Sequence, residues 1–201
     1  MLHIVPIYAL ALFVGLGCAE RTHASPVALS FEMSVVDDGL EIHYEVTNRR
    51  GTPIHVVDKL VVHNPQTGKF ERTDRLSILN SRGAGDVQFS LASIGGDGGA
   101  YMTHGATYQP VPAGKTHRGS VTVPYPIKAW NPVGGARALR GHPLTAIFVL
   151  GYYEQLPTQW AERPSAAGPL LVPAVTASQP RLLVTRPQFL PLASAWTARR
   201  R

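Results

Sequence analysis

The feature that most constrains the fold is an alternation of apolar and polar residues that begins at Val27. Small or polar residues separate Val27, Leu29, Phe31, Met33 and Val35, as in a strand with one buried face. A second alternating run follows Asp38-Gly39, a dipeptide typical of two-residue hairpin turns. We therefore predict an antiparallel hairpin that places Val35 opposite Ile42, Met33 opposite Tyr44 and Phe31 opposite Val46.

A third apolar segment follows at residues 54–63. It is rich in Val and Leu and comes after a turn-like break at 48–53, so it is predicted to be a strand. If it pairs directly with the second strand, Tyr44 faces Val56, Leu40 faces Leu60, and Glu41 meets Lys59 on the outer face. We therefore expect the first three strands to be neighbours in one sheet.

Shorter strands are predicted in the rest of the chain, separated by turn residues. The candidates are Leu76–Leu79, Val87–Ile94, Ala106–Val111, Gly119–Pro124, Thr145–Tyr153 and Arg181–Thr185. The chain contains 19 Gly and 17 Pro, which disfavours long helices. We predict an all-β protein, an antiparallel immunoglobulin-like β-sandwich of roughly seven to nine strands. The analogy concerns architecture alone, because the cysteine pair of true immunoglobulin domains is absent.

The chain is expected to contain one domain, because about 180 residues follow the N-terminal leader. We place the domain at residues 25–192, after a leader and short linker at 1–24 and before a basic tail at 193–201. Within the domain, residues 155–180 contain five prolines among Ala, Ser and Gly. This segment is predicted to be a long irregular connection.

The leader is an apolar stretch of seventeen residues, followed by the only cysteine of the chain, Cys18. Within it, the run from Ile7 to Val14 has the length of a signal-peptide hydrophobic region and is too short to span a bilayer. We therefore predict that the protein is exported. Cleavage by signal peptidase I would suit the small residues of Gly17-Cys18-Ala19 or of Thr22-His23-Ala24, and the second site would leave Ser25 as the first mature residue.

Gly15-Leu16-Gly17-Cys18 resembles the signal of bacterial lipoproteins, in which a small residue precedes a cysteine that receives diacylglycerol. Gly15 and Leu16 stand in the reverse of that family's preferred order. The resemblance covers the leader alone. It implies lipid attachment at Cys18 and membrane anchoring through several acyl chains. Since Ala19 rather than Asp follows the cysteine, it also implies the outer membrane, whereas an unlipidated protein would be periplasmic.

Positive charge is concentrated in the C-terminal part of the chain. All 13 acidic residues lie in residues 1–162 together with 13 of the 19 basic residues, so the net charge of +6 comes from six arginines in 163–201. These arginines suit a solvated tail, or attraction to anionic headgroups, lipopolysaccharide or an acidic partner. Nucleic-acid binding is not expected, because no basic stripe is interleaved with aromatic residues.

Two groups of residues are candidates for binding a metal ion. Glu41, His43 and Glu45 alternate along one strand face, from which neighbouring side chains can approach one ion. Met102 and His104 supply a thioether and an imidazole, a soft pair that suits copper in an oxidising compartment. The alternatives are an ordinary polar strand face for the first group and a loop without metal for the second.

Tyr125 and Trp130 lie among prolines in the segment 125–132. If exposed, they would form an aromatic surface for a peptide or a glycan. If buried, Trp130 would close one end of the core.

The sequence contains no common catalytic signature. Gly-x-Ser-x-Gly, His-Glu-x-x-His and a cysteine nucleophile outside the leader are all absent. We therefore expect a non-enzymatic binding or assembly module of the bacterial cell envelope, with an envelope protein or a glycan as its partner. The alternatives are a periplasmic copper-type metal-binding protein and a hydrolase with dispersed catalytic residues.

Overall fold

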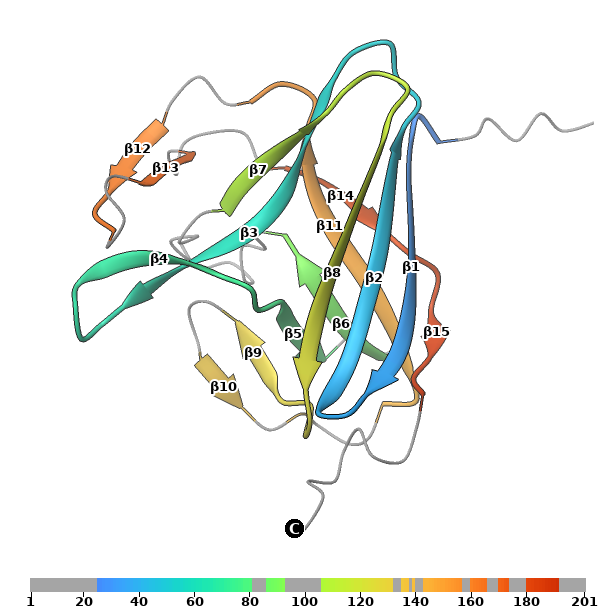
Figure 1. Cartoon of the computed structure of the whole chain (residues 1–201), viewed down its shortest axis with the longest axis vertical. Helices are drawn as coiled ribbons and strands as arrows, with labels where there is room; N and C mark the ends of the chain where they lie inside the picture. The colour runs from blue at the N-terminus through green and yellow to red at the C-terminus, as the bar shows by residue number, and fades with distance from the viewer. Residues whose placement is uncertain are drawn as a thin grey trace, which may run out of the picture.

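A computed structural model describes residues 25–80, 86–92, 106–131, 135–137, 139, 143–156, 160–165, 170–173 and 180–191. Every regular element in these residues is a β-strand, so the all-β prediction is confirmed. The strands form a small antiparallel sheet, a large mixed sheet and a two-stranded ribbon (Figure 1). In the described part of the chain, no helix has the length and apolar character needed to cross a membrane.

The small sheet has the order β1-β2-β8, with bounds Val27–Val36, Gly39–Asn48 and Thr116–Pro124. β1 and β2 form the predicted hairpin, but the predicted register is wrong by two residues: Val35 lies opposite Leu40, Met33 opposite Ile42 and Phe31 opposite Tyr44. The turn is Asp37-Asp38. Gly39, predicted to lie in the turn, is the first residue of β2. A Cβ at this position would lie 2.4 Å from the Val123 carbonyl oxygen. A shift of two residues leaves each side chain on its predicted face.

The prediction that β3 (Ile54–Asn64) pairs with β2 is also wrong. β3 belongs to the large sheet, where it pairs with β4 (Lys69–Thr73), β7 (Ala106–Val111) and the end of β11 (Thr145–Tyr153). The place beside β2 is taken by β8, which pairs with β2 from Gly39 to Thr47. Lys59 consequently forms its ion pair with Asp74 rather than with Glu41.

Asn48 explains why the chain leaves the small sheet after β2. It is fully buried, and its Nδ2 donates to the carbonyl oxygens of Thr52 (2.9 Å), Val111 (3.0 Å) and Pro112 (3.1 Å). Its Oδ1 accepts a hydrogen bond from the backbone N–H of Arg50 at 3.0 Å. These bonds hold the β2–β3 loop against the β7–β8 turn. Both connections therefore pass between the two sheets at the same end of the molecule.

We call this end the crossing end. It consists of residues 25–26, 49–53, 112–115, 154–156 and 180–181, which flank strand termini that meet there (Figure 1). Backbone hydrogen bonds of 2.9 Å join Arg49 N–H to the Pro26 carbonyl and Asn48 N–H to the Lys115 carbonyl. The chain thus leaves the N-terminal segment and enters the fold at the crossing end.

The large sheet has the order β10-β9-β5-β6-β11-β3-β4, with β7 paired to β3 and with β14 and β15 paired to β11. The bounds of its remaining strands are Ser77–Asn80 for β5, Asp86–Leu91 for β6, Ala129–Asn131 for β9, Gly135–Arg137 for β10, Arg181–Val184 for β14 and Gln188–Phe189 for β15. β6 and β11 run parallel, with Phe89 opposite Phe148. The sheet is therefore mixed, and the prediction of antiparallel pairing throughout is wrong.

The described strands also exceed the predicted number, because short strands such as β4, β9 and β15 form where the sequence shows no clear alternation. Two more lie within residues 155–180, the predicted irregular connection. These are β12 (Trp160–Arg163) and β13 (Leu170–Pro173), which form an antiparallel ribbon. The backbone N–H of Phe70 in β4 donates to the Pro164 carbonyl at 2.6 Å, so the ribbon is joined to the large sheet.

One hydrophobic core fills the space between the small and the large sheet. Phe148 of β11 stacks on Phe31 of β1 and on Tyr44 of β2, with ring centroids 5.8 Å and 5.2 Å apart. Ile42 and Val46 of β2 are fully buried beside them. The apolar faces predicted for the first two strands therefore form one side of the core, except for Val35, which is 49% exposed. β11 contributes much of the other side.

Candidate functional site

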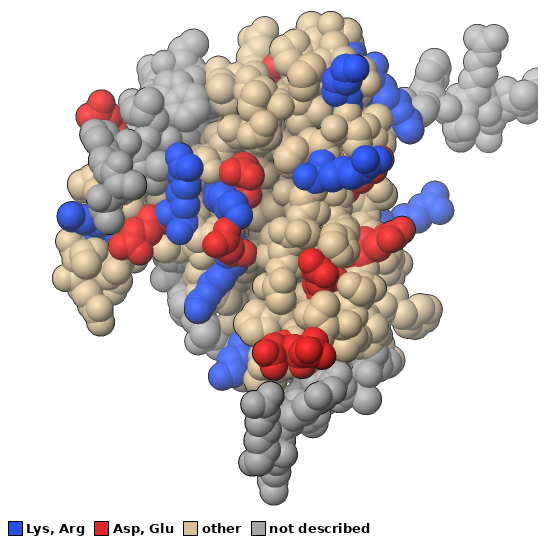
Figure 2. Space-filling view, viewed as in Figure 1, with Lys and Arg blue, Asp and Glu red and all other residues tan. Residues whose placement is uncertain are grey.

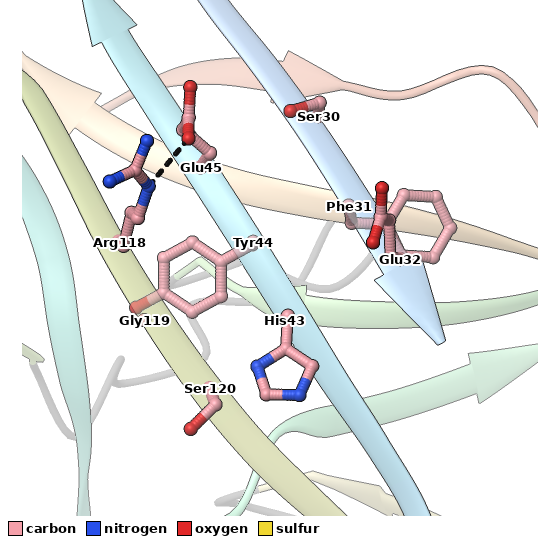
Figure 3. A pocket seen from close by; sticks show the side chains of 9 residues that line it. All are labelled: Ser30, Phe31, Glu32, His43, Tyr44, Glu45, Arg118, Gly119 and Ser120. Atoms are coloured by element: carbon pink, nitrogen blue, oxygen red, sulfur yellow. Dashed lines mark hydrogen bonds and ion pairs between the residues drawn. The ribbon is translucent and has the colours of Figure 1, made fainter. Parts of the chain in front are cut away.

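The polar face of the small sheet carries the first group of predicted metal ligands. Glu41, His43 and Glu45 occupy alternate positions of β2, and His43 Nε2 lies 3.3 Å from a carboxylate oxygen of Glu41. Glu45 instead accepts a hydrogen bond from Nε of Arg118 at 2.7 Å (Figure 3). Among the described residues, no group of three or more His, Cys, Asp and Glu is placed to hold a metal ion.

An open depression of about 460 Å³ lies on this face. Its lining residues come from β1 (Ser30, Phe31, Glu32), β2 (His43, Tyr44, Glu45) and β8 (Arg118, Gly119, Ser120) (Figure 3). The Tyr44 ring covers Gly119, where a Cβ would lie 2.4 Å from the ring. Phe31 and Tyr44 are only 2% and 5% exposed. The depression offers a ligand both polar groups and apolar surface.

Tyr125 and Trp130 are both partly buried and pack against the core. The guanidinium carbon of Arg75 lies 5.7 Å from the centre of the Trp130 ring, within the range of a cation–π contact. The hydroxyl of Tyr125 is buried, and no group of the described residues bonds to it. The pair thus offers less aromatic surface to a peptide or glycan than an exposed pair would.

Three of the predicted site residues lie outside the described residues. Met102 and His104, the candidate copper ligands, and Cys18, the candidate lipid site, all belong to this group. Copper binding and lipid attachment at these positions stay predictions.

A larger pocket, which the sequence analysis missed, lies at the crossing end. It has a volume of about 890 Å³ and is lined by Arg50, Thr52, Pro53, His55, Tyr152, Tyr153, Glu154, Gln155, Leu156 and Arg181. β11 assembles it, because Tyr153 pairs with His55 of β3 on one side and Tyr152 pairs with Arg181 of β14 on the other. We call it the crossing-end pocket.

Two arginines hold the carboxylate of Glu154 in this pocket. Nη1 and Nη2 of Arg50 donate to its two oxygens at 2.9 Å and 2.8 Å, and Nη1 of Arg181 lies 2.9 Å from Oε1. Arg50 and Glu154 have side chains only 28% and 27% exposed, whereas Arg181 is 67% exposed. Because one carboxylate faces two guanidinium groups, the cluster retains an excess positive charge, with Arg181 the more accessible cation.

Two other polar atoms of the pocket residues are buried without a hydrogen bond to any described group. They are Nε of Arg50 and Nδ1 of His55. Burial lowers the pKa of His55, so its imidazole is neutral at pH 7. Buried polar atoms of this kind raise the free energy of the folded state unless they find a partner. A ligand that accepts a hydrogen bond from Arg50 would remove part of that penalty.

The wall of the pocket beside His55 is aromatic. Tyr153 packs against Tyr108 of β7, with ring centroids 5.3 Å apart, and their hydroxyls share a hydrogen bond. Burial is the main cause that raises the pKa of both tyrosines, so both stay neutral at physiological pH. The charged groups of the pocket therefore lie beside tyrosine side chains that carry no charge.

One sequence signal could have indicated this pocket. Glu154 and Glu162 are the only acidic residues after Asp97, in a part of the chain that is rich in arginine. An acidic residue in such a segment is readily enclosed by guanidinium groups. The sequence does not indicate which arginines contact Glu154, because Arg50 is 104 positions away from it.

Comparison of the chain with protein-family models, with curated proteins and with solved structures finds no match. The depression on the small sheet contains the ion pair of Glu45 with Arg118 and a further carboxylate, Glu32, whereas the crossing-end pocket is larger and retains positive charge. The crossing-end pocket is the better candidate site.

Proposed function

We propose that this protein is an exported, non-enzymatic binding module of the bacterial cell envelope, and that the crossing-end pocket is its ligand site. The observation that carries the proposal is that Arg50 and Arg181 both contact the single carboxylate of Glu154. Two guanidinium groups against one carboxylate favour a ligand with a further anionic group, a carboxylate or a phosphate. Such groups are common on envelope glycans, lipids and acidic proteins.

The geometry favours binding over catalysis. Nδ1 of His55 bonds to no described group, so the described part of the pocket contains no histidine–carboxylate pair of the kind that activates a nucleophile. The charged side chains are engaged with one another in fixed ion pairs, which suits recognition. Turnover of a substrate by the purified protein, abolished in His55→Ala, would contradict the non-enzymatic assignment.

We also propose that the fold is immunoglobulin-like in its architecture of two packed sheets. Two sheets enclose one core, and the connections between strands meet at the ends, which is where such sandwiches commonly bind their partners. The crossing-end pocket occupies that position. The parallel pairing of β6 with β11 departs from the immunoglobulin pattern.

We further propose that export delivers the protein to the periplasm or to the outer membrane, where lipid on Cys18 holds it. The proposal rests on the leader of the sequence. Intact-mass measurement of the protein recovered from cells, in wild type and in Cys18→Ser, tests it. A chain that starts at Cys18 with added lipid mass, lost in the variant, supports anchoring, whereas a chain that starts at Ser25 contradicts it.

The ligand site is tested by calorimetric titration of residues 25–201 with inorganic phosphate as the probe. We expect Arg181→Gln to weaken phosphate binding about tenfold, because it removes the accessible cation. The matched control is Arg118→Gln, which removes an exposed arginine that also pairs with a glutamate, on the small sheet. Equal affinity in wild type and both variants, or no phosphate binding at all, would overturn the assignment of the site.

A further inference from the structure

Exposed basic side chains gather at one end of the small sheet, and an exposed acidic pair forms the turn at the other end. The segments of the crossing end contain four basic residues, Arg49, Arg50, Lys115 and Arg181, and one acidic residue, Glu154. Arg49, Lys115 and Arg181 are exposed. At the opposite end, the turn between β1 and β2 consists of the exposed pair Asp37-Asp38. Over the small sheet, Figure 2 shows basic side chains toward the upper end and acidic ones toward the lower end.

The N-terminal segment joins the fold at the crossing end. β1 begins at Val27, and the Pro26 carbonyl is bonded to Arg49 at the crossing end. Six residues, 19–24, separate Cys18 from Ser25, and six extended residues reach at most about 20 Å. The ten residues of β1 span about 33 Å. A lipid on Cys18 would therefore bring the crossing end, and not the Asp37-Asp38 end, to the membrane surface.

From these two independent observations we infer that the crossing end docks on the surface of a membrane that contains anionic lipids. Arg49 and Lys115 belong to the docking surface outside the pocket, and the pocket that Arg50 and Arg181 line receives the phosphate of one lipid headgroup beside Glu154. Cations near an anionic bilayer gain attraction that falls off within a Debye length. The inference rests on the proposed function, since it names the anionic ligand of the same pocket.

The lipid surface explains features that a soluble anion alone would not. A single phosphate would use Arg181 and Arg50, whereas Arg49 in the β2–β3 loop and Lys115 in the β7–β8 turn do not line the pocket. A bilayer presents many anionic headgroups at once, so it engages all the exposed cations together. Removal of one cation from such a surface is expected to weaken binding about fivefold.

Vesicle co-flotation of residues 25–201 tests the inference without the lipid anchor, since these residues contain every described strand and the whole described core. The vesicles contain phosphatidylcholine with a quarter of phosphatidylglycerol, or phosphatidylcholine alone. We expect binding to the anionic vesicles that weakens with added salt, and none to the neutral ones. Absence of binding to the anionic vesicles, or equal binding to both kinds, would overturn the inference.

Charge-matched variants locate the surface. Arg49→Glu combined with Lys115→Glu is expected to weaken vesicle binding at least 25-fold, on the order of fivefold for each cation removed. Lys69→Glu combined with Arg72→Glu makes the same change of charge at two exposed positions of β4, and is expected to have a small effect. Replacement of Arg199, Arg200 and Arg201 by Ser tests the tail. Equal losses in the two charge-reversed variants, or loss of binding with the tail arginines, would overturn the inference.

Phosphate titration of the same preparations separates this inference from the proposed function. Phosphate binding that depends on Arg181, without any binding to anionic vesicles, would leave the ligand site standing and remove the membrane surface. Failure of both would remove the ligand site as well. Thermal unfolding of each variant is measured alongside, and an unchanged midpoint shows that lost binding is not lost folding.

Discussion

Asn48 is the residue on which the junction between the two sheets depends. Its side chain is fully buried and bonds to three carbonyl oxygens and one backbone N–H, which belong to two different loops. A buried polar side chain with this number of partners contributes more to specificity of the fold than to its gross stability, because each of its bonds replaces one to water.

Replacement of Asn48 by Ala is expected to lower the free energy of unfolding by about 2 to 4 kcal/mol, because it leaves buried carbonyl groups without a donor. Urea-induced unfolding measures the change. Asn64→Ala is the control, because Asn64 accepts hydrogen bonds from Gln66 and Thr67 in an exposed turn, and we expect it to cost less than about 1 kcal/mol. Equal costs for the two substitutions would contradict the role assigned to Asn48.

Tyr44 should make the stability of the protein sensitive to alkaline pH. Burial, and to a lesser extent the charge of Asp58, raises the pKa of Tyr44 from 10.0 to about 12. Between these values the unfolded chain releases the proton while the folded chain keeps it. The stability that Tyr44 contributes is therefore complete below pH 10 and is lost as the pH rises toward 12, by about 3 kcal/mol.

The test compares urea unfolding of wild type and Tyr44→Phe at pH 9 and at pH 11. Phe keeps the ring that stacks on Phe148 but has no proton to lose. We expect the variant to lose less stability than wild type between the two pH values. An identical loss in both proteins would show that Tyr44 does not titrate with a raised pKa.

At the scale of strands, the sequence predicts elements better than it predicts their partners. β7 and β11 have the predicted bounds, and the first hairpin forms between the predicted strands. These outcomes depend on local alternation, which the sequence displays directly. The register of the hairpin and the partner of β3 depend instead on the contacts of Gly39 with β8 and on the bonds of Asn48, which join residues far apart in the chain.

The register of the hairpin supplies a prediction at this scale. A methyl group on Gly39 would lie 2.4 Å from the Val123 carbonyl oxygen, so Gly39→Ala must push β2 and β8 apart. We expect the free energy of unfolding to fall by about 2 kcal/mol or more. Gly51→Ala, where a Cβ meets nothing within 4 Å, is expected to leave it nearly unchanged. Similar stabilities in urea for the two variants would argue that Gly39 lies in the turn after all.

The crossing-end pocket could not be predicted from the sequence, because it also depends on contacts between residues far apart in the chain. Arg50, Glu154 and Arg181 are brought together only because β11 pairs with β3 and with β14. No motif or spacing marks the three residues as neighbours. The residues that the sequence does mark, Glu41, His43 and Glu45, do share a strand face, but Glu45 is bonded to Arg118.

At the scale of the whole molecule, the fold gathers positive charge at the end where β1 begins. The Asp37-Asp38 turn lies at the other end of the small sheet, some ten residues of β-strand away. A charge distribution of this kind orients a protein in the field of an anionic surface. Attachment through Cys18 and electrostatic docking would therefore hold the molecule in the same orientation.

The central claim is that the crossing-end pocket binds an anionic ligand. The most direct test is a titration with phosphate that follows the imidazole signals of His55 and His43 by NMR. His55 lines the pocket and has a pKa lowered by burial, and a bound anion should raise that pKa. His43 on the small sheet serves as the internal reference. The account predicts that the His55 signals shift and saturate, with its pKa raised, and that this response is lost in Arg181→Gln. Shifts of the same size at His43, or none at His55, would contradict it.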